Sequence, residues 1–520
     1  MLNKKIIIFI LFLIALGVRL IALKQNYIIA PDAILYIKMA KLFFAGQFHS
    51  EIIRNYSYYA FYPFLIVPFY KVFGDWVYAG QWVSTLCGAL TVIPLYLLAR
   101  RIFDEKIAFW GAIFYAICPN LIRYSAEVLR DIPFVFFYTS ALWLGYRGIK
   151  DEKLVFVGLS ALFIALSASL RIEGLTLLAT LPLFIFWRGH KNDFSWKRRL
   201  IPFGVLCASV FCILFLFGLF LNQKGIQIGK IQIKALKNVV NVKILENQTI
   251  KNIEKEVEET DISQIGKEFF YLAEKHRFVL YSYHIFFKTV KVFNILFLLF
   301  LFGLIKRKKI GYSQDEFLLF FIYAVFVPIF LIYLKDTNYL STRHPFPMVV
   351  PSLIWSGVGF VELRERLILW IKGRDFPSKE QMLRWLTPLL LFVICVPLLA
   401  MAFAPHRNDK LELKETGLWL RNNGYAHSTI LGQHEFARLA FYADGKFIPF
   451  LKRSYEDIIR FAREEKVNLL VINKNTIDHL SPHFLDMVSP RDLHQIDMSE
   501  VRTDKYAIMV FQVNLRERNK

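Results

Sequence analysis

Hydrophobic residues fall into long runs along most of this 520-residue chain, and charged residues gather in the short segments between them. A bilayer is crossed by about 20 apolar residues in a helix, and windows of about 19 residues identify such runs. The pattern predicts about eleven membrane-spanning helices. They are 6–23, 77–99, 107–123, 132–149, 154–171, 174–188, 200–222, 286–305, 317–334, 344–362 and 386–404.

Basic residues cluster in alternate connecting segments, such as 100–106, 147–153, 188–199, 306–309 and 364–384. Excess Lys and Arg mark cytoplasmic loops, so the alternation predicts a cytoplasmic N-terminus, begun by Lys4 and Lys5. Residues 24–76, 120–131 and 223–285 then form outer loops. Two amphipathic stretches in the first loop, Asp32–Gly46 and Tyr58–Phe73, are typical of helices at the membrane interface. We expect helix in the third loop around Lys251–His276.

The pattern changes near Pro405, where short apolar strands begin to alternate with amphipathic helices. Residues 428–432, 467–473 and 506–513 are predicted strands, with helices over 410–423 and from Ser454 to Lys466. The sequence therefore predicts a membrane domain over 1–404 and a small extracytoplasmic α/β domain over 405–520. In that domain, His434 and Glu435 are polar candidates that a short strand-to-helix loop also explains.

The composition agrees with a polytopic α-helical membrane protein: 56% of residues are hydrophobic and 51 are Phe, with mean hydropathy +0.40. The formal charge of +22 follows the loops and forms no single basic face, so nucleic acid is not an expected partner. All five cysteines fall within or at the ends of predicted spans. A disulfide framework or thiolate metal site is therefore not expected.

Asp32 emerges just after the first span, at the predicted outer surface of the membrane. With Tyr36 four residues later, it lies on one face of a helix that begins near Pro31. A carboxylate at this depth could act on a lipid-linked substrate. It could equally cap the helix and complement its dipole.

Two carboxylates in the turn before the fourth span, Glu127 and Asp131, share a face if that turn is helical. Close acids suit metal binding or acid–base chemistry. In the alternative reading they form a polar cap that Arg123 or Arg130 neutralises.

Ionisable residues also interrupt apolar runs at Arg171–Glu173 and at Tyr339–His344. Such residues are costly at membrane depth and are usually functional or paired. Arg171 and Glu173 could pair with each other or face a substrate. Arg343 has the guanidinium fork that matches a phosphate, although a snorkelling arginine would look the same. His344 could donate a hydrogen bond to a phosphate, or it could have no part in binding.

These features occur in a definite order: Pro31-Asp32 with Tyr36, Ser125 to Pro133, Arg171-Ile172-Glu173-Gly174, and Tyr339 to Pro347. In that order the chain resembles, over residues 1–365, the multi-spanning GT-C glycosyltransferases. Within them it is similar to the family 39-like group of protein-mannosyltransferases and aminoarabinose transferases. The resemblance implies an enzyme that passes a sugar from a polyprenyl-phosphate donor to a lipid, glycan or protein acceptor on the outer face.

The resemblance also implies residue roles. Asp32 would match the first-loop acid and deprotonate the acceptor, with inversion at the anomeric carbon. Asp131, with Glu127, would match the second-loop acid, and Arg343 and Arg171 would contact the lipid phosphate. Tyr36, Glu173, Tyr339 and His344 are further substrate-binding candidates. Many members carry two consecutive first-loop acids, whereas Ala33 follows Asp32 here, so the acceptor stays open.

A metal requirement also stays open, with Asp32 and Asp131 as its candidate ligands. Two other functions share these features: a transporter or flippase of lipid-linked sugars, and an O-antigen-ligase-like or polymerase-like enzyme. A transporter often shows paired, broken spans in two related halves, and the sequence has no such pattern.

Overall fold

The computed structural model describes residues 3–515, apart from several gaps. The gaps are 57–59, 191–195, 224–271, 273–274, 375, 406, 408–409, 451–453, 478–480, 482, 499–500 and 502–506. The predicted helix over Lys251–His276 and most of the third outer loop lie outside the described residues. The chain forms two compact units: Met1–Leu23 with Tyr36–Ala404, and Lys24–Leu35 with Pro405–Lys520.

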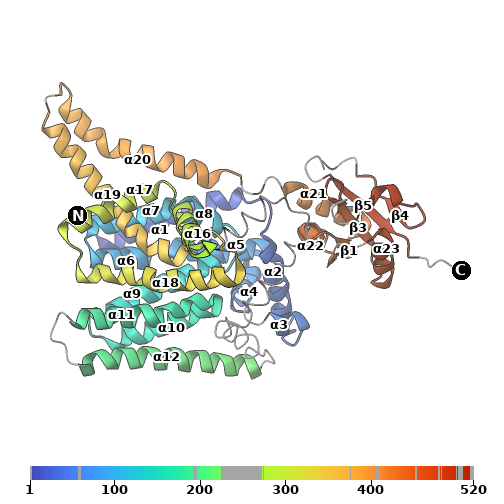
Figure 1. Ribbon diagram of the computed structural model, residues 1–520, viewed down its shortest axis with the longest axis horizontal. Coiled ribbons are helices and arrows are strands. Elements are labelled where there is room, and N and C mark those ends of the chain that lie inside the picture. The colour runs from blue at the N-terminus through green and yellow to red at the C-terminus, as the bar shows by residue number, and fades with distance from the viewer. Residues whose placement is uncertain are drawn as a thin grey trace. The chain divides into compact units, whose positions relative to one another are not determined.

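The first unit is helical (Figure 1). The helices of the chain up to the first long gap are α1 (Lys4–Lys24), α2 (Pro31–Phe44), α3 (Glu51–Asn55), α4 (Phe61–Phe73), α5 (Trp76–Leu90), α6 (Val92–Ile102), α7 (Glu105–Ile117), α8 (Pro119–Ser125), α9 (Asp131–Lys150), α10 (Leu154–Leu170), the 3-10 turn η2 (Ile172–Thr176), α11 (Leu177–His190) and α12 (Trp196–Gln223). The residues of α2 up to Leu35 belong to the second unit. After that gap come α16 (Arg277–Phe293), α17 (Leu296–Ile310), η3 (Gln314–Glu316), α18 (Phe317–Thr337), α19 (Phe346–Lys372) and α20 (Lys379–Phe403).

Five helical segments among the described residues are long and apolar enough to cross a membrane. They are Lys4–Lys24, Trp76–Ile102, Gln314–Thr337, Phe346–Lys372 and Lys379–Phe403. Two bent pairs raise the number to seven if each pair is one span: α7 with α8, at 56°, and α16 with α17, at 107°. The eleven predicted stretches coincide with helices, but the count of eleven spans is not confirmed.

The predicted span over 286–305 is two helices and not one. α16 ends at Asn294, whose φ of +56° lies in the left-handed region that helices do not continue through. The Asn294 side chain then accepts a hydrogen bond from the backbone of Ile295 at 2.7 Å, and α17 begins at the next residue.

Small residues let helices of the first unit approach closely. At Gly359 in α19, a Cβ atom would lie 1.9 Å from the carbonyl oxygen of Leu299 in α17. Helices pack this closely in membranes where glycine removes the side chain from the contact. Figure 1 shows α17 and α19 side by side, and α19 also packs against α7.

The second unit holds a five-stranded sheet in the order β2-β1-β3-β5-β4. Its elements after Pro405 are α21 (Leu411–Leu420), η5 (Arg421–Tyr425), β1 (Thr429–Gly432), η6 (His434–Phe436), α22 (Ala437–Tyr442), β2 (Lys446–Pro449), α23 (Tyr455–Glu464), β3 (Leu469–Asn473), η7 (Leu485–Met487), β4 (Leu493–Gln495) and β5 (Ile508–Val513). β1, β2 and β3 run parallel, and β5 is antiparallel to β3 and β4.

The alternation of side chains in these strands fills two cores. Ile430 and Val471 face a core shared with α21 and α22, whereas Leu431 and Leu470 face the core formed with α23. Ser454 caps α23 by accepting a hydrogen bond from the backbone of Asp457. The three predicted strands are present; β2 and β4, only four and three residues long, had no clear pattern in the sequence.

Candidate active site

Asp131 is the first residue of α9, and the turn before it is held from several sides. The Oγ of Ser84 in α5 donates to the carbonyl of Leu129 at 3.0 Å. Arg130 reaches from the same turn to the carbonyl of Leu170, at 2.7 Å, at the end of α10. These contacts hold the turn directly before the carboxylate.

The turn itself corrects one prediction. α8 ends at Ser125 and α9 begins at Asp131, so Glu127 and Asp131 do not share a helical face. The reason is Pro133, since a proline ring clashes with the carbonyl four residues earlier, at Leu129. The proline is accepted in the first turn of α9 and prevents the helix from beginning earlier. Glu127 is buried in the non-helical turn.

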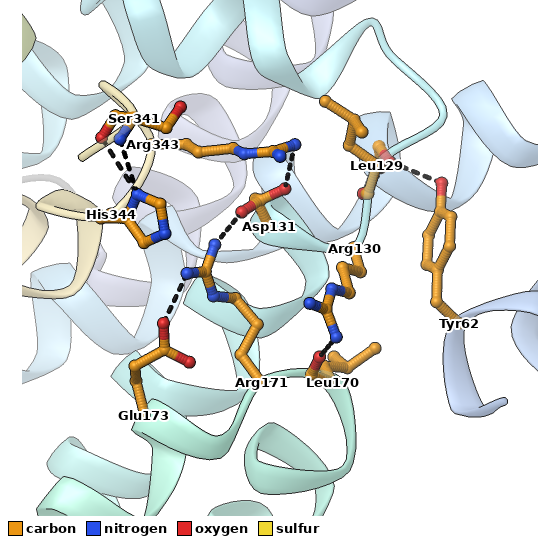
Figure 2. A network of polar contacts seen from close by, with 11 residues as sticks. Tyr62, Leu129, Arg130, Asp131, Leu170, Arg171, Glu173, Ser341, Arg343 and His344 are labelled. Atoms are coloured by element: carbon orange, nitrogen blue, oxygen red, sulfur yellow. Dashed lines mark hydrogen bonds and ion pairs between the residues drawn. The ribbon is translucent and has the colours of Figure 1, made fainter. Parts of the chain in front are cut away.

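The Asp131 carboxylate is 2% exposed and pairs with two arginines. Arg171 donates from Nη1 to Oδ1, and the Nη1 of Arg343 lies 3.4 Å from Oδ2. Neither arginine is near in sequence: Arg171 follows α10, and Arg343 precedes α19. Figure 2 shows the two guanidinium groups approaching the carboxylate from different sides.

Arg171 joins a second carboxylate to the cluster. Its Nη2 donates to Oε1 of Glu173 at 2.5 Å, and its side chain is 8% exposed. Gly174 permits the tight turn that brings these groups together, because a Cβ there would lie 2.3 Å from the Oγ of Ser167 and 2.6 Å from the backbone nitrogen of Ala168. The Arg171–Glu173 pair expected from the sequence is therefore present, and Arg171 bridges it to Asp131.

His344 lies beside this cluster, in the turn between α18 and α19 (Figure 2). The backbone N–H of Ser341 lies 2.9 Å from its Nδ1, and the carbonyl oxygen of Ser341 lies 3.2 Å from the same nitrogen. Burial, followed by the positive charge of Arg171, lowers the pKa of His344 to about 4. The imidazole is therefore neutral near pH 7.

The charges in this region are unequal. The guanidinium groups of Arg130, Arg171 and Arg343 stand near the carboxylates of Asp131 and Glu173. Among these five groups, three cations stand against two anions, and the imidazole is neutral. The side chain of Arg343 is 27% exposed, so the cluster is open to solvent on that side. Such an arrangement can bind an anion, and guanidinium forks match phosphate oxygens.

The other predicted site residues lie in different settings. Tyr36 packs edge-on against Tyr62, with ring centroids 5.2 Å apart. The hydroxyl of Tyr62 is 3.1 Å from the Oγ of Ser84, which holds the turn before Asp131. Tyr339 is 61% exposed and its backbone contacts Thr337. Asp32 is half-buried in the first turn of α2 and belongs to the second compact unit.

The cluster does not fit a divalent cation. Both oxygens of Asp131 accept from guanidinium groups, and cations outnumber anions among the five groups. Across the part of the chain that the structure describes, no group of three or more His, Cys, Asp or Glu side chains is placed to hold a metal ion. Both oxygens of Asp131 are thus engaged by arginines, and the metal requirement stays open.

Sequence reasoning missed Arg19, Tyr62 and Ser84. Arg19 is fully buried in α1, and its signal was an arginine inside an otherwise apolar run. Tyr62 and Ser84 gave no signal, because hydroxyl groups are common in membrane helices and their contacts join different helices.

Comparison with known proteins gives one sequence family and several solved structures. The family described as dolichyl-phosphate-mannose-protein mannosyltransferase matches residues 60–217. No curated protein matches the chain. An oligosaccharyltransferase of Archaeoglobus fulgidus, solved with Zn and sulfate, is 14% identical with a TM-score of 0.55, covering 95% of this chain and 72% of that one.

ArnT of Cupriavidus metallidurans matches along nearly its full length. Its complex with undecaprenyl phosphate has a TM-score of 0.53 at 12% identity, covering 98% of each chain. Its apo form has a TM-score of 0.57 at 12% identity, covering 97% of this chain and 98% of that one. The chain has the GT-C fold.

The GT-C resemblance and the fold predicted from the sequence are thus confirmed. The family match extends from the residue before α4 into α12, and includes Glu127, Asp131, Arg171 and Glu173. Arg343 and His344 lie beyond it. The cluster around Asp131 is therefore assembled from the matched segment and from the later α18–α19 turn.

Proposed function

We propose that this protein is an integral membrane glycosyltransferase that moves a sugar from a polyprenyl-phosphate donor to an acceptor on the outer face of the membrane. The observation that carries the proposal is the cluster of Arg171 and Arg343 around Asp131. It offers guanidinium groups to a phosphate at the end of membrane helices. The GT-C fold and the family match support the reaction class.

The donor phosphate would bind against Arg343, the more exposed of the two arginines on Asp131. Asp131 would then orient the guanidinium groups and not accept a proton, since both its oxygens are engaged. Glu173 would hold Arg171 from the other side, and the ring N–H of His344 would donate to a phosphate oxygen.

The transfer needs one proton acceptor and one leaving group. The acceptor hydroxyl attacks the anomeric carbon, the bond from that carbon to the phosphate oxygen breaks, and the polyprenyl phosphate leaves with the bonding electrons. Asp32 is our proposed base for the hydroxyl proton, because the GT-C resemblance implies that it matches the first-loop acid of these enzymes. Attack opposite to the leaving phosphate inverts the configuration. The arginines would stabilise the charge that develops on the phosphate.

The remaining candidates have supporting roles in this proposal. Glu127, buried in the turn that leads to Asp131, would support the second-loop acid. Tyr36 and Tyr339 would contact the substrate. The basic connecting segments support a cytoplasmic N-terminus and a C-terminal unit on the outer side.

The test is sugar transfer from radiolabelled polyprenyl-phosphate sugars to native membrane extract, in membranes that carry each variant. Asp32→Asn should abolish transfer, and Asp336→Asn, at an exposed acid before the α18–α19 turn, should not. Arg343→Gln should weaken use of the donor, with Arg54→Gln as the matched exposed control. Equal transfer by wild type and Asp32→Asn would remove Asp32 from the mechanism.

The same assay separates the two main alternatives. A flippase would move lipid-linked sugar across the bilayer without transfer to any acceptor. An O-antigen-ligase-like enzyme would use a polyprenyl diphosphate donor and reject the monophosphate. Either result would overturn the proposed donor chemistry.

A further inference from the structure

In the parallel part of the C-terminal sheet, the direction in which the chain adds strands reverses between β1 and β3. β2 pairs with one edge of β1 and β3 with the other, and all three strands are parallel. The chain leaves β1 through α22 to reach β2, then passes through α23 to β3 on the opposite side of β1. In open α/β sheets, ligands bind outside the carboxyl ends of strands at such a point.

The segments that leave the two strands go to opposite faces. After β1 the chain enters α22, whose Leu439 and Ala440 pack in the core with Ile430. After β3 it carries Ile477 and Phe484 into the other core, with α23. The carboxyl ends of β1 and β3 therefore lie where the two connections separate.

Polar side chains meet at this edge. Gln433 follows β1 and Asn473 ends β3; each is 7% exposed. The Oε1 of Gln433 accepts from the backbone of Asn473 at 3.2 Å, and its Nε2 donates to Thr476 at 3.2 Å. The Nδ2 of Asn473 donates to Glu435 at 3.3 Å. The two buried amides thus hold the two loops together.

The same two loops also carry exposed side chains that include both hydrogen-bond donors and acceptors. His434, Lys474 and Asn475 are exposed beside the half-buried Glu435. One ammonium and one carboxylate do not favour an anion. The single glycine at the end of β1, Gly432, is not the glycine-rich loop that a dinucleotide needs.

We propose that the carboxyl ends of β1 and β3 form a binding site for a neutral carbohydrate. Amide, carboxylate, imidazole and ammonium groups together both donate to and accept from hydroxyl groups, which is the chemistry a sugar requires. The proposal goes beyond the transfer reaction, because it assigns a ligand to the C-terminal unit on the chemistry of that unit alone.

The test uses the full chain in nanodiscs and saturation-transfer NMR. The probes are the methyl glycosides of glucose, mannose, galactose, N-acetylglucosamine and arabinose. The triple variant His434→Ala, Lys474→Ala, Asn475→Ala should lose at least tenfold in affinity for the glycosides that bind wild type. All three side chains are exposed, so the fold should survive, and its melting temperature checks this.

A matched control is the triple variant Asn422→Ala, Lys446→Ala, His494→Ala. It removes the same residue types from exposed positions elsewhere in the C-terminal unit and should bind as wild type does. Equal loss in both triples, or no saturation transfer to any of the five glycosides, would overturn the site. Binding of inorganic phosphate that only the first triple abolishes would show an anion site and would also overturn it.

Binding and transfer are measured separately. Loss of the carbohydrate site with transfer intact leaves the proposed function standing. If the transfer assay fails, this site still stands provided that the wild type binds a glycoside and only the first triple variant loses that binding.

Discussion

Arg19 in α1 donates a hydrogen bond from Nε to the Oγ of Ser125, the last residue of α8, at 3.1 Å. Its Nη1 also donates to the carbonyls of Ala15, at 2.9 Å, and Ala116, at 3.4 Å. Its guanidinium carbon lies 4.9 Å from the ring centroid of Tyr115. A charge buried in an apolar segment is costly, so this arginine invites a functional explanation. It ties the α7–α8 bend to α1, directly before the turn that carries Asp131.

We therefore predict that Arg19→Met lowers transfer activity more than it lowers the amount of folded protein. The substitution keeps an apolar stem of similar length and removes the hydrogen bonds to Ser125 and Ala116. Misplacement by about 1 Å can cost about 100-fold in rate. The measurement is kcat and donor KM per folded molecule, with kcat expected to fall and KM to change little.

Lys24→Met is the matched control, because Lys24 is an exposed cation at the end of the same helix. Arg19→Lys should restore part of the activity, since an ammonium can make some of the same hydrogen bonds. Transfer per folded molecule that equals wild type in Arg19→Met would leave Arg19 with a purely structural role.

A second prediction concerns the charge of Asp131. Asp131→Asn keeps the shape of the side chain and removes the anion between Arg171 and Arg343. Breaking a buried ion pair from one side costs about 3–5 kcal/mol, because it leaves charge without compensation. The melting temperature in detergent should fall clearly, whereas Asp336→Asn at an exposed position should change it little. A melting temperature equal to wild type would mean that Glu173 alone compensates the arginines.

The third prediction is a dependence of stability on pH through His344. Burial and Arg171 lower its pKa from 6.5 to about 4, and these effects outweigh Glu173 and Asp131, which favour protonation. Below pH 6.5 the unfolded chain takes up a proton that the folded chain does not. The contribution of His344 to the free energy of unfolding is therefore complete above about pH 6.5. It is lost progressively as the pH falls to about 4.

His344→Asn should flatten this slope. The asparagine Oδ1 can still accept from the backbone of Ser341, but it does not titrate in this range. Melting temperatures of the wild type and the variant should converge as the pH falls from 6.5 toward 4. A constant difference across that window would contradict the assignment.

The sequence predicts the members of the cluster around Asp131 but not most of their pairing. Each member, Asp131, Arg171, Glu173, Arg343 and His344, stood out as an ionisable residue at the edge of an apolar run. Only the Arg171–Glu173 pair could be proposed from spacing, because its members are two residues apart. The pairs of Asp131 with Arg171 and Arg343 join residues 40 and 212 positions apart. Such pairs depend on how helices pack, which local periodicity does not encode.

The errors also have local physical reasons. Pro133 was available to show that Glu127 and Asp131 could not share a helix, and Asn294 interrupts a run whose hydropathy alone looks continuous. The short strands β2 and β4 form because a sheet already exists beside them. Their pairing comes from tertiary structure and not from intrinsic propensity.

The last prediction tests the packing that positions these elements. In Gly359→Ala, the new Cβ would lie 1.9 Å from the carbonyl oxygen of Leu299, a backbone atom that cannot rotate away. α17 and α19 must then separate, at a cost toward the upper end of about 1–3 kcal/mol for overpacking. α19 follows directly from the turn that carries Arg343 and His344, so transfer should fall together with the melting temperature. Gly158→Ala in α10 is the matched control, because its Cβ would meet no heavy atom within 4 Å. If both variants melt at the same temperature in detergent, α17 and α19 do not pack as closely as this contact requires.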